Sequence, residues 1–473
     1  MVTEKASKKN LDNARATKET LDLLHDIEGV VKINAVAMTH EDRHSTGLLG
    51  LDLMMGSGVA PGMYVFVGPE QSAKTTAAIT IMGASGADTD IKVKALFDAE
   101  GSTGNSADYV SNIFETQGFK IPAEEVFGVR DATGKGWRIP PTVYYQDISE
   151  GETIFNWIYA LAKRLPDKRF SKNRWWYVYE NSTENKKKWA DVADKTQGQG
   201  QEGLWVPAKN GALQAMILLD SLPAILADAL DDDEASNALA VDARMFSKHL
   251  KRIKGSFRRK RIALIAINQL RTNPGARFSD PRYEPGGNAV AFFSDVRFWL
   301  TPRALSGVPF NPKGDKGEEV EPSVNGGEDR YRYIHCGLKK NKLSSHVKET
   351  WMRLWVADSN GEGRGYDPVW DTFYYLYSTG QLEGKKSSIK LNVAKVGEAL
   401  KAITWLEFKT LILGNKDQWE PIYKKIGYKT INLRAGCFNQ MKKGKGTDLY
   451  FAKIGAGKTK LVIDSNDDDV DAE

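Results

Sequence analysis

A short segment in the first fifth of the chain, Met63 to Thr76, constrains the fold more than any other. It reads MYVFVGPEQSAKTT, an apolar run that ends at Gly68 and is followed by a helix start near Lys74. The apolar run is typical of a buried strand in a parallel sheet, and the glycine lets the backbone turn sharply. Successive backbone N–H groups can then point toward one anion, with the positive end of a helix dipole behind them. The segment therefore predicts a strand, a phosphate-binding loop and a helix N-terminus.

The loop follows the pattern Gly-x-x-x-x-Gly-Lys-Ser/Thr except that Ala73 stands where the second glycine is usual. Lys74 would bring a positive charge to the β- and γ-phosphates of a nucleotide, and the Thr75 hydroxyl would bind Mg²⁺. We expect alanine to be tolerated only if its φ angle is negative; the alternative is a degenerate loop that binds nucleotide weakly or not at all. The candidate nucleotide-binding residues of this segment are Gly68, Pro69, Glu70, Gln71, Ser72, Ala73, Lys74, Thr75 and Thr76.

Length and composition limit the class of protein. The chain has 473 residues and 41% apolar content, which allows a large core and suggests about two to four domains. The longest clean apolar run, Ile262 to Ile267, is far shorter than a membrane span, and the charged start MVTEKASKKN does not resemble a signal peptide. Only Cys336 and Cys437 occur, which excludes a disulfide framework and a four-cysteine zinc ribbon. We therefore expect a cytoplasmic protein without membrane contact.

Strand-like and helix-like segments alternate from Thr46 onward. Examples are VKALFDAE, the helical DYVSNIFETQG, the strand in LQAMILLDS, the long helix in VDARMFSKHLKRIKGSF and the strand in RIALIAINQ. This alternation predicts an α/β fold, with a mostly parallel sheet covered by helices on both faces. Ser149 and Glu152 also match a capping box at the start of one helix.

Polar side chains follow three of the predicted strands. The pairs are Asp98 with Glu100, Asp220 with Ser221, and Asn268 with Gln269. Nucleotide sites lie at the carboxyl ends of strands in parallel sheets, so these residues should meet beside the phosphate loop. Asp220 would orient Mg²⁺, Glu100 would position and deprotonate the attacking water, and Gln269 would bind the γ-phosphate. The alternatives are an Asp220 that only caps a turn and a Glu100 in a solvated loop.

Several stretches, taken in order, resemble the bacterial and phage RecA-type DNA strand-exchange recombinases. They are STGLLGLDLMMGSG, GPEQSAKTT, ALFDAEGS, ILLDSLPAI, ARMFSKHLKRIKG, INQLR and PGGNAVAFFSDVR. The resemblance runs from about residue 45 to 356, and the divergent insertions are typical of a phage member. It implies a RecA-like P-loop ATPase that uses ATP and Mg²⁺, forms helical filaments on single-stranded DNA, and catalyses homologous pairing and strand exchange in recombination and repair.

The resemblance also implies roles for individual residues. The implied catalytic residues are Glu100, Lys74, Gln269, Lys340 and Lys342, and the implied Mg²⁺ ligands are Thr75 and Asp220. Tyr109 is similar to the tyrosine that stacks on adenine, with an ordinary helix-surface tyrosine as the alternative. Lys340 and Lys342, in LKKNKL, resemble a pair that reaches the ATP of the adjacent subunit. The active site would then be complete only between two subunits.

Candidate DNA-binding residues fall in two segments. The first, Arg244 to Arg261, carries nine basic residues that could contact phosphates, with a solvated basic helix face as the alternative. The second, Arg271 to Gly287, follows Gln269 and corresponds in position to the family's second DNA-binding loop. ATP would order this loop through Gln269, and hydrolysis would release the DNA. The individual candidates are Arg244, Arg271, Arg277, Phe278, Arg282, Tyr283, Gly286 and Gly287.

The predicted organisation has four parts. Residues 1–44 form an N-terminal helix and strand arm for subunit packing, with packing on the chain's own core as the alternative. Residues 45–356 form the ATPase and DNA-binding core, 357–463 a small C-terminal domain, and 464–473 an acidic disordered tail. An insertion at about 168–210 interrupts the core. The expected partners are single-stranded DNA, double-stranded DNA and further copies of the chain in a filament, with single-strand binding and mediator proteins as additional candidates. The expected location is the cytoplasm of a bacterial cell or of a phage-infected host.

Two other classes of function are compatible with the motifs. A RecA-fold DNA helicase or motor would share the phosphate loop and Asp220, but it would not be expected to carry the INQ and PGGNA stretches in this arrangement. A non-hydrolysing DNA-binding mediator would follow if Ala73 makes the loop inactive. Stimulation of ATP hydrolysis by single-stranded DNA would separate the recombinase from both.

Overall fold

The computed structural model describes much of the chain between residues 43 and 391. The described ranges are 43–44, 46–55, 58–85, 91, 93–117, 119–165, 167–171, 174–178, 203–207, 213–227, 238–272, 282–304, 318–323, 326–343, 347–378, 382–385 and 388–391. Nearly all of the predicted N-terminal arm, most of the predicted C-terminal domain and the whole acidic tail lie outside these residues. Among the described helices, none has the length and apolar content that crossing a bilayer requires.

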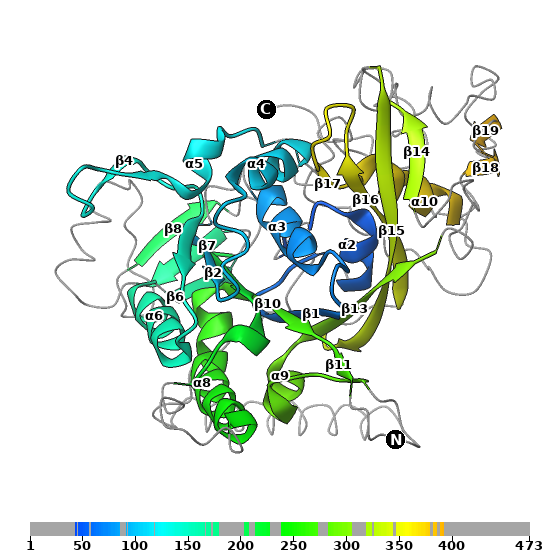
Figure 1. Ribbon diagram of the computed structural model, residues 1–473. Helices are drawn as coiled ribbons and strands as arrows, with labels where there is room; N and C mark the ends of the chain where they lie inside the picture. The colour runs from blue at the N-terminus through cyan, green and yellow to red at the C-terminus, as the bar shows by residue number, and fades with distance from the viewer. Residues whose placement is uncertain are drawn as a thin grey trace, which may run out of the picture. The chain divides into compact units, whose positions relative to one another are not determined.

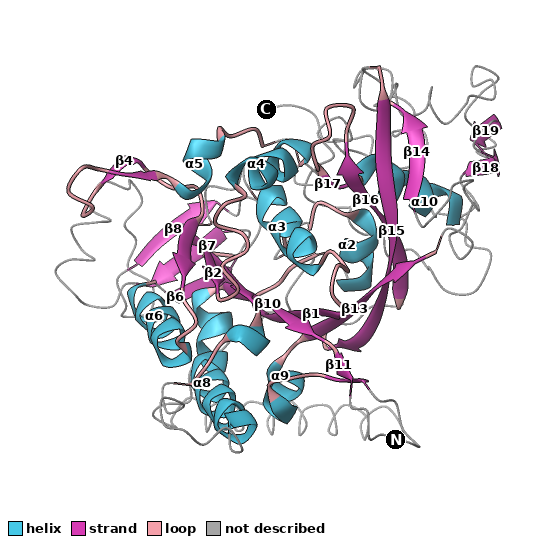
Figure 2. Cartoon of the chain, in the orientation of Figure 1, coloured by secondary structure: helices cyan, strands magenta, loops and turns pink. Residues whose placement is uncertain are grey.

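A ten-stranded sheet organises the described core (Figure 2). Its strands are β1 (Gly62–Gly68), β2 (Val93–Asp98), β5 (Tyr144–Asp147), β9 (Ala215–Asp220), β10 (Ile262–Gln269), β13 (Val296–Arg303), β14 (Glu318–Pro322), β15 (Glu328–Asn341), β16 (Glu349–Ala357) and β17 (Gly365–Tyr366). The order is β17-β16-β15-β13-β1-β10-β9-β2-β5, and β14 pairs with β15. Neighbours run parallel from β13 to β5 and antiparallel from β13 to β17. The predicted α/β fold with a mostly parallel central sheet is confirmed, and an antiparallel extension adds to it.

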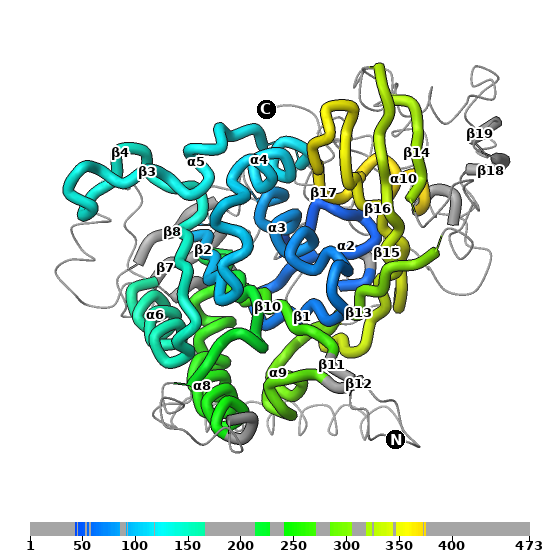
Figure 3. Tube along the Cα trace, in the orientation of Figure 1, coloured from blue at the N-terminus to red at the C-terminus, as the bar shows by residue number. Residues whose placement is uncertain are grey.

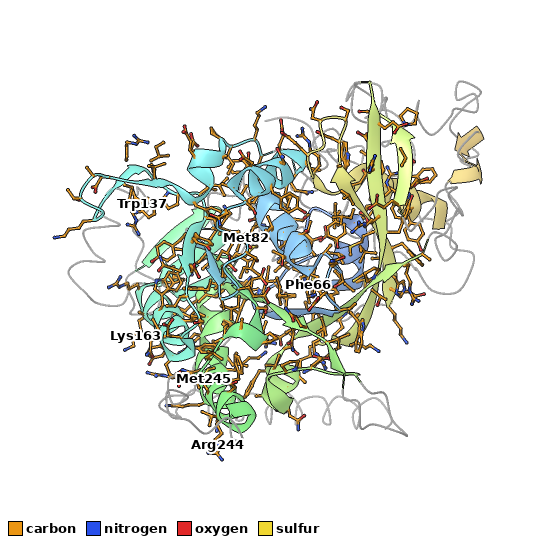
Figure 4. All side chains as sticks on the ribbon, viewed as in Figure 1. Phe66, Met82, Trp137, Lys163, Arg244 and Met245 are labelled. Atoms are coloured by element: carbon orange, nitrogen blue, oxygen red, sulfur yellow. The ribbon has the colours of Figure 1, made fainter. Side chains whose placement is uncertain are left out.

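Helices pack on both faces of this sheet (Figure 1). They are α2 (Leu49–Met55), α3 (Lys74–Ala84), α4 (Ala107–Thr116), α5 (Ala123–Phe127), α6 (Gly151–Arg164), the 3₁₀ helix η2 (Leu222–Ala224), α8 (Ala238–Lys260), α9 (Gly287–Phe293) and α10 (Pro368–Ser378). In β1, Phe66 faces the core beneath α2, α3 and α4, where Met82 also lies (Figure 4). Its neighbour Val65 faces the core beneath α6 and α8, with Met245. This alternation reflects the two-residue period of a strand, and it fixes β1 between two apolar layers.

The start of α6 differs from its prediction. The helix begins at Gly151 after Glu150, and the described residues provide no side-chain cap for it, so the predicted capping box of Ser149 and Glu152 is wrong. The segment before α6 instead pairs with a distant segment: Gly151 N donates to Leu226 O at 2.8 Å, and Leu226 N donates to Ser149 O at 2.9 Å. Tertiary pairing thus takes the place of the local cap.

Two additions interrupt the core between β2 and β9. β3 (Val129–Arg130) and β4 (Trp137–Ile139) form a small hairpin. β6 (Asp167–Ser171), β7 (Arg174–Val178) and β8 (Gly203–Pro207) form a separate antiparallel sheet, which lies within the range of the predicted insertion. Trp176 in β7 stands opposite Trp205 in β8, so at least this pair of insertion tryptophans is in register across strands.

The described core continues past residue 356. β17 pairs with β16, and α10 packs on α2 and β16. The buried carboxylate of Asp371 on α10 accepts hydrogen bonds from Leu49 N at 2.5 Å and from Gly50 N at 3.3 Å, so it caps the start of α2. The aromatic stretch FYYLY at residues 373–377 lies on α10. β18 (Leu382–Lys385) and β19 (Ser388–Leu391) form a further hairpin.

Candidate nucleotide-binding site

The ends of four strands meet at one edge of the sheet, where the tube of Figure 3 shows α3 starting beside β1. In the register of the sheet, Gly68 at the end of β1 stands opposite Gln269 at the end of β10. Asp98 at the end of β2 stands opposite Asp220 at the end of β9. The structure thus brings together the strand-end residues that the sequence singled out. The carboxyl ends of parallel strands in register make this edge the natural place for a nucleotide.

The loop between β1 and α3 is tightly folded. A Cβ atom on Gly68 would lie 2.4 Å from Leu300 O and 2.5 Å from Ser72 Oγ, so the position requires glycine. Ser72 Oγ donates to Pro69 O at 2.8 Å. Lys74 Nζ donates to Pro69 O at 2.6 Å and lies 3.3 Å from Ser72 Oγ, so this lysine folds back over its own loop. Burial lowers the pKa of Lys74, while nearby carboxylates act in the opposite direction.

Ala73 adopts a left-handed conformation, with φ 57° and ψ 34°. The expectation that alanine needs a negative φ here is therefore wrong. A left-handed conformation costs an alanine about 1 kcal/mol or more. The surrounding hydrogen bonds hold it: Ala77 N donates to Ala73 O at 3.0 Å as the first turn of α3, and Tyr366 OH donates to the same oxygen at 3.2 Å. The loop keeps the backbone path of a glycine at this position and accepts the strain.

Thr75 and Asp220 lie side by side below the loop. Thr75 Oγ1 donates to Asp220 Oδ2 at 2.8 Å, and Asp220 is 1% exposed. Burial raises the pKa of Asp220 to about 7, although the Thr75 hydroxyl lowers it. A hydroxyl and a carboxylate oxygen are the hard ligands that Mg²⁺ takes beside substrate phosphates, and a bound cation would stabilise the ionised carboxylate. The two residues therefore fit the Mg²⁺ that the motif implies.

Glu100 receives two hydrogen bonds on one oxygen. Gln269 Nε2 donates to Glu100 Oε1 at 2.8 Å, and Ser221 Oγ donates to the same atom. The residue predicted to activate water and the residue predicted to sense the γ-phosphate are thus in direct contact. Asp98, by contrast, supports the chain after β2, because its Oδ2 accepts from Thr103 N at 2.7 Å and from Tyr145 OH at 3.1 Å. The sequence noted Ser221 only as a strand-end residue.

Tyr109, the candidate adenine contact, lies on α4 beside the first turn of α3. Its hydroxyl is 2.8 Å from Thr76 Oγ1, and its half-buried ring packs against the core. Burial raises the pKa of Tyr109, while the bond to Thr76 lowers it. The contact with Thr76 in the first turn of α3 therefore positions the tyrosine next to the phosphate loop.

The candidate DNA loop begins and ends at this same edge. After β10, β11 (Arg271–Thr272) pairs with β12 (Arg282–Tyr283), and this pairing closes the loop at its base. Asn268 Nδ2 donates to Pro285 O at 3.0 Å, and Leu270 N donates to Gly68 O at 3.2 Å. The loop is therefore tied to both β10 and the end of β1. Residues 273–281, with the candidates Arg277 and Phe278, lie outside the described residues.

The end of the candidate DNA loop runs into α9. Gly286 and Gly287 have φ angles of 88° and 65°, in the left-handed region that favours glycine. The two glycines therefore form the turn that leads the chain into α9.

Lys340 and Lys342 lie at the other end of α9. Lys340 Nζ donates to Ala291 O at 2.6 Å and to Phe292 O at 2.9 Å, and Lys342 Nζ donates to Phe292 O at 3.4 Å. A third lysine joins them, because Lys254 Nζ donates to Phe293 O at 2.5 Å and to Asp295 Oδ2 at 2.7 Å. We call these three residues the lysine cluster. Cations are favourable at a helix C-terminus, where backbone carbonyls lack partners.

The basic segment on α8 divides into two sets. The exposed residues are Arg244, Lys248, Lys251, Arg252, Arg258 and Arg259. Lys260 is buried and donates to Leu165 O at 2.7 Å, Arg261 is also buried, and Lys254 belongs to the lysine cluster. Figure 4 shows Arg244 directed away from the core at one end of α8. Only the exposed set is available to contact phosphates. The sequence alone did not show which basic residues of the segment are buried.

Comparison with known proteins supports the resemblance that the motifs predict. Residues 197–305 match the family model of the RecA N-terminal domain. RecA of Aquifex pyrophilus is 33% identical over 141 residues, which make up 30% of this chain and 36% of that protein. RecA of Thermus aquaticus is 25% identical over 192 residues, or 40% of this chain and 50% of that protein. The chain thus spans about a third to a half of the length of these curated relatives.

A crystal structure of the RadB recombinase aligns with a TM-score of 0.36 and 16% sequence identity, covering 68% of this chain and 97% of that chain. The parallel sheet, the loop before α3 and the residues at the strand ends define an α/β protein of the P-loop class. The sequence matches are more specific: the predicted relationship to RecA-type recombinases is confirmed.

Proposed function

We propose that this chain is an ATP-dependent recombinase that assembles as a helical filament on single-stranded DNA and exchanges strands with a homologous duplex. The hydrogen bond of 2.8 Å from Gln269 Nε2 to Glu100 Oε1 supports this most. It joins the residue that would activate water to the strand that leads directly into the hairpin of β11 and β12. The hydrolytic site and the candidate DNA loop therefore share one strand end.

ATP would bind with its phosphates against the loop before α3. Backbone N–H groups of the loop and Lys74 would hold the β- and γ-phosphates. Thr75 and Asp220 would hold Mg²⁺, which supplies charge neutralisation at these phosphates when bound. Tyr109 would contact the adenine. Glu100 would orient the attacking water and take its proton.

Gln269 would act as the switch. In the described structure its amide binds Glu100, and a γ-phosphate would compete for the same amide. A change at Gln269 would reach the DNA loop over a short path, because Asn268 is bonded to Pro285 and Leu270 is bonded to Gly68. ATP would thereby order the loop for single-stranded DNA, and hydrolysis would release it.

Filament assembly would complete the site. Lys340 and Lys342 would leave the carbonyls of α9 and contact the ATP of the adjacent subunit. Lys340 would give up its bonds to two backbone carbonyls and Lys342 its bond to one, and each would gain a phosphate, which carries a full negative charge. The exposed arginines and lysines of α8 would contribute phosphate contacts, so DNA binding would depend on salt and little on sequence.

The test is ATP hydrolysis with and without single-stranded DNA, at low and at moderate salt. We expect strong stimulation by DNA that weakens as salt rises. Hydrolysis that is indifferent to DNA would favour a different motor, such as a helicase. Binding of ATP and DNA without any hydrolysis would favour a mediator whose loop is disabled by Ala73.

A further inference from the structure

Ser221 follows Asp220 at the end of β9 and has no exposed surface. Its hydroxyl donates to Glu100 Oε1, the same oxygen that accepts from Gln269 Nε2. Two donors from two different strand ends thus hold one carboxylate oxygen. The phosphate-loop motif assigns no task to this serine.

We propose that Ser221 is the fixed positioning residue for Glu100, and that it keeps the carboxylate in place while Gln269 exchanges between Glu100 and the γ-phosphate. This inference rests on the proposed ATP hydrolysis. Ser221 would act through Glu100, to which its hydroxyl donates. It deepens the proposed site by separating a static donor from a moving one.

The backbone around Ser221 explains why it is the static donor. Ala99 N donates to Asp220 O at 2.6 Å, which ties the residue before Glu100 to the residue before Ser221. Ala224 N donates to Ser221 O at 3.0 Å at the start of η2. Gln269, in contrast, is only half-buried and lies where β10 leaves the sheet for the DNA loop.

The exposure of Glu100 makes such a donor important. Glu100 lies at the surface, where water competes for its carboxylate oxygens. If Gln269 left for a phosphate, Glu100 would lose one of its two donors. The buried Ser221 hydroxyl would then be the donor that holds the Glu100 carboxylate against exchange with water.

The experiment compares Ser221→Ala, Ser221→Thr and a matched control, Ser85→Ala, in the full chain. Ser85 is also buried, and its hydroxyl donates to Met82 O at 2.7 Å at the far end of α3. We measure kcat and KM for ATP with saturating single-stranded DNA, the melting temperature, and the affinity for a fluorescent ATP analogue.

We expect Ser221→Ala to lower kcat by roughly ten- to a hundredfold, since it removes a hydrogen bond to a charged group. KM and analogue affinity should stay within about threefold, because the phosphate loop is untouched. Ser221→Thr keeps the hydroxyl and should recover most of kcat, and Ser85→Ala should resemble the unsubstituted chain. Combined with Glu100→Gln, Ser221→Ala should have little further effect.

Three outcomes would overturn the inference. A kcat of Ser221→Ala equal to that of the unsubstituted chain would remove the positioning role and leave the proposed function intact. Joint loss of analogue binding and turnover would assign Ser221 to the folding of the site instead. Absence of hydrolysis by the unsubstituted chain would overturn the proposed function and this inference together.

Discussion

The edge of the sheet where β1, β2, β9 and β10 end, which we call the nucleotide edge, gathers polar side chains, and so does the C-terminal end of α9. The side chains of the two regions have different kinds of hydrogen-bond partner. At the nucleotide edge, side chains bind one another: Thr75 is bonded to Asp220, and Gln269 to Glu100. At the end of α9, Lys340 and the other members of the lysine cluster bind mostly backbone carbonyls. The first arrangement depends on the identity of both partners, whereas the second requires only a cation near a helix C-terminus.

This difference indicates that the hydrogen bonds at the nucleotide edge are fixed, whereas those at the end of α9 can exchange for other partners. The contact between Thr75 and Asp220 depends on where α3 starts after β1 and where β9 ends in the sheet. The two lysines on or after β15 hold carbonyls that any other cation or water could satisfy, so they can leave at little cost. Loss of a bonded side chain at the nucleotide edge should therefore lower the rate of hydrolysis most, and substitutions in the lysine cluster should change assembly, regulation or stability.

Glu100→Gln should have the largest effect. A positioned general base contributes roughly a hundredfold to ten-thousandfold to a rate, so ATP hydrolysis should fall by about that factor. ATP binding should persist, because the phosphate loop is unchanged. Glu124→Gln on α5 is a control, since Glu124 is also an exposed glutamate but lies away from the edge. Hydrolysis by the Glu100 variant at the normal rate would remove Glu100 from the chemistry.

Lys340→Ala should come next, with a loss of roughly ten- to a hundredfold in DNA-stimulated hydrolysis and a normal fold. The neighbouring Lys339→Ala is the control, because Lys339 lies 4.3 Å above the Trp299 ring instead of on α9. The measurement is the ATP hydrolysis rate with single-stranded DNA, together with a melting curve.

A mixing experiment separates a role across subunits from a role within one chain. Subunits with Lys340→Ala keep Glu100, and subunits with Glu100→Gln keep Lys340. If Lys340 reaches the neighbouring site, mixed filaments should contain some complete sites and recover part of the hydrolysis. Two inactive variants that stay inactive when mixed would confine Lys340 to its own chain.

The nucleotide edge could be predicted from the sequence because its pieces are local. Asp220 and Gln269 each end an apolar run, and parallel strands bring such ends to one edge. The same logic could not find the part of Ser221, because a serine after a strand has many uses. Its contact with Glu100 depends on the register between β2 and β9.

The lysine cluster was only partly predictable. The sequence marked Lys340 and Lys342 through a family motif, but it counted Lys254 as one of nine basic residues in the segment around α8. Lys254 meets Asp295 across 41 positions of sequence, and this contact forms only when α8, α9 and β13 are packed. Helix periodicity predicts on which face of the helix a residue lies, but it does not predict which residue of another element will contact it.

The pH profile should distinguish the lysine cluster from the nucleotide edge. The pKa of Lys340 is lowered to about 8, mainly by burial and also by the positive charges of Lys342 and Arg297, while Asp295 acts in the opposite direction. Lys340 should therefore lose its charge as pH rises through about 8, and kcat/KM with DNA should fall by up to tenfold between about pH 7 and 9. Lys340→Arg keeps its charge, so its profile should stay flat.

The sign for stability is opposite to that for activity. The folded chain favours neutral Lys340 relative to the unfolded chain, so this residue lowers the free energy of unfolding as pH falls from about 10.5 to about 8, and has no further effect below that. A kcat/KM profile that falls equally for Lys340→Arg would assign the pH dependence to another group.

Lys254→Ala should affect stability more than turnover. Its bonds to Phe293 O and to Asp295 are partly buried, so their loss should lower the free energy of unfolding by about 2 kcal/mol. Lys251→Ala, one turn away on the exposed face of α8, should change it by less than about 0.5 kcal/mol. Denaturant unfolding measures both. Equal stabilities would mean that Lys254 is as free to leave α9 as Lys340 and Lys342 are.

Ala73→Gly should have the smallest effect. Ala73 already has the left-handed backbone that glycine adopts without strain, so the substitution should stabilise the folded chain by about 1 kcal/mol and change kcat by less than about threefold. Ala77→Gly, in the regular part of α3, should destabilise the chain by about 1 kcal/mol. Thermal unfolding and ATP hydrolysis of both variants check this. A large gain in turnover with Ala73→Gly would mean that alanine keeps the loop out of the conformation needed for hydrolysis. The side-chain contacts at the nucleotide edge would then not be sufficient for full activity.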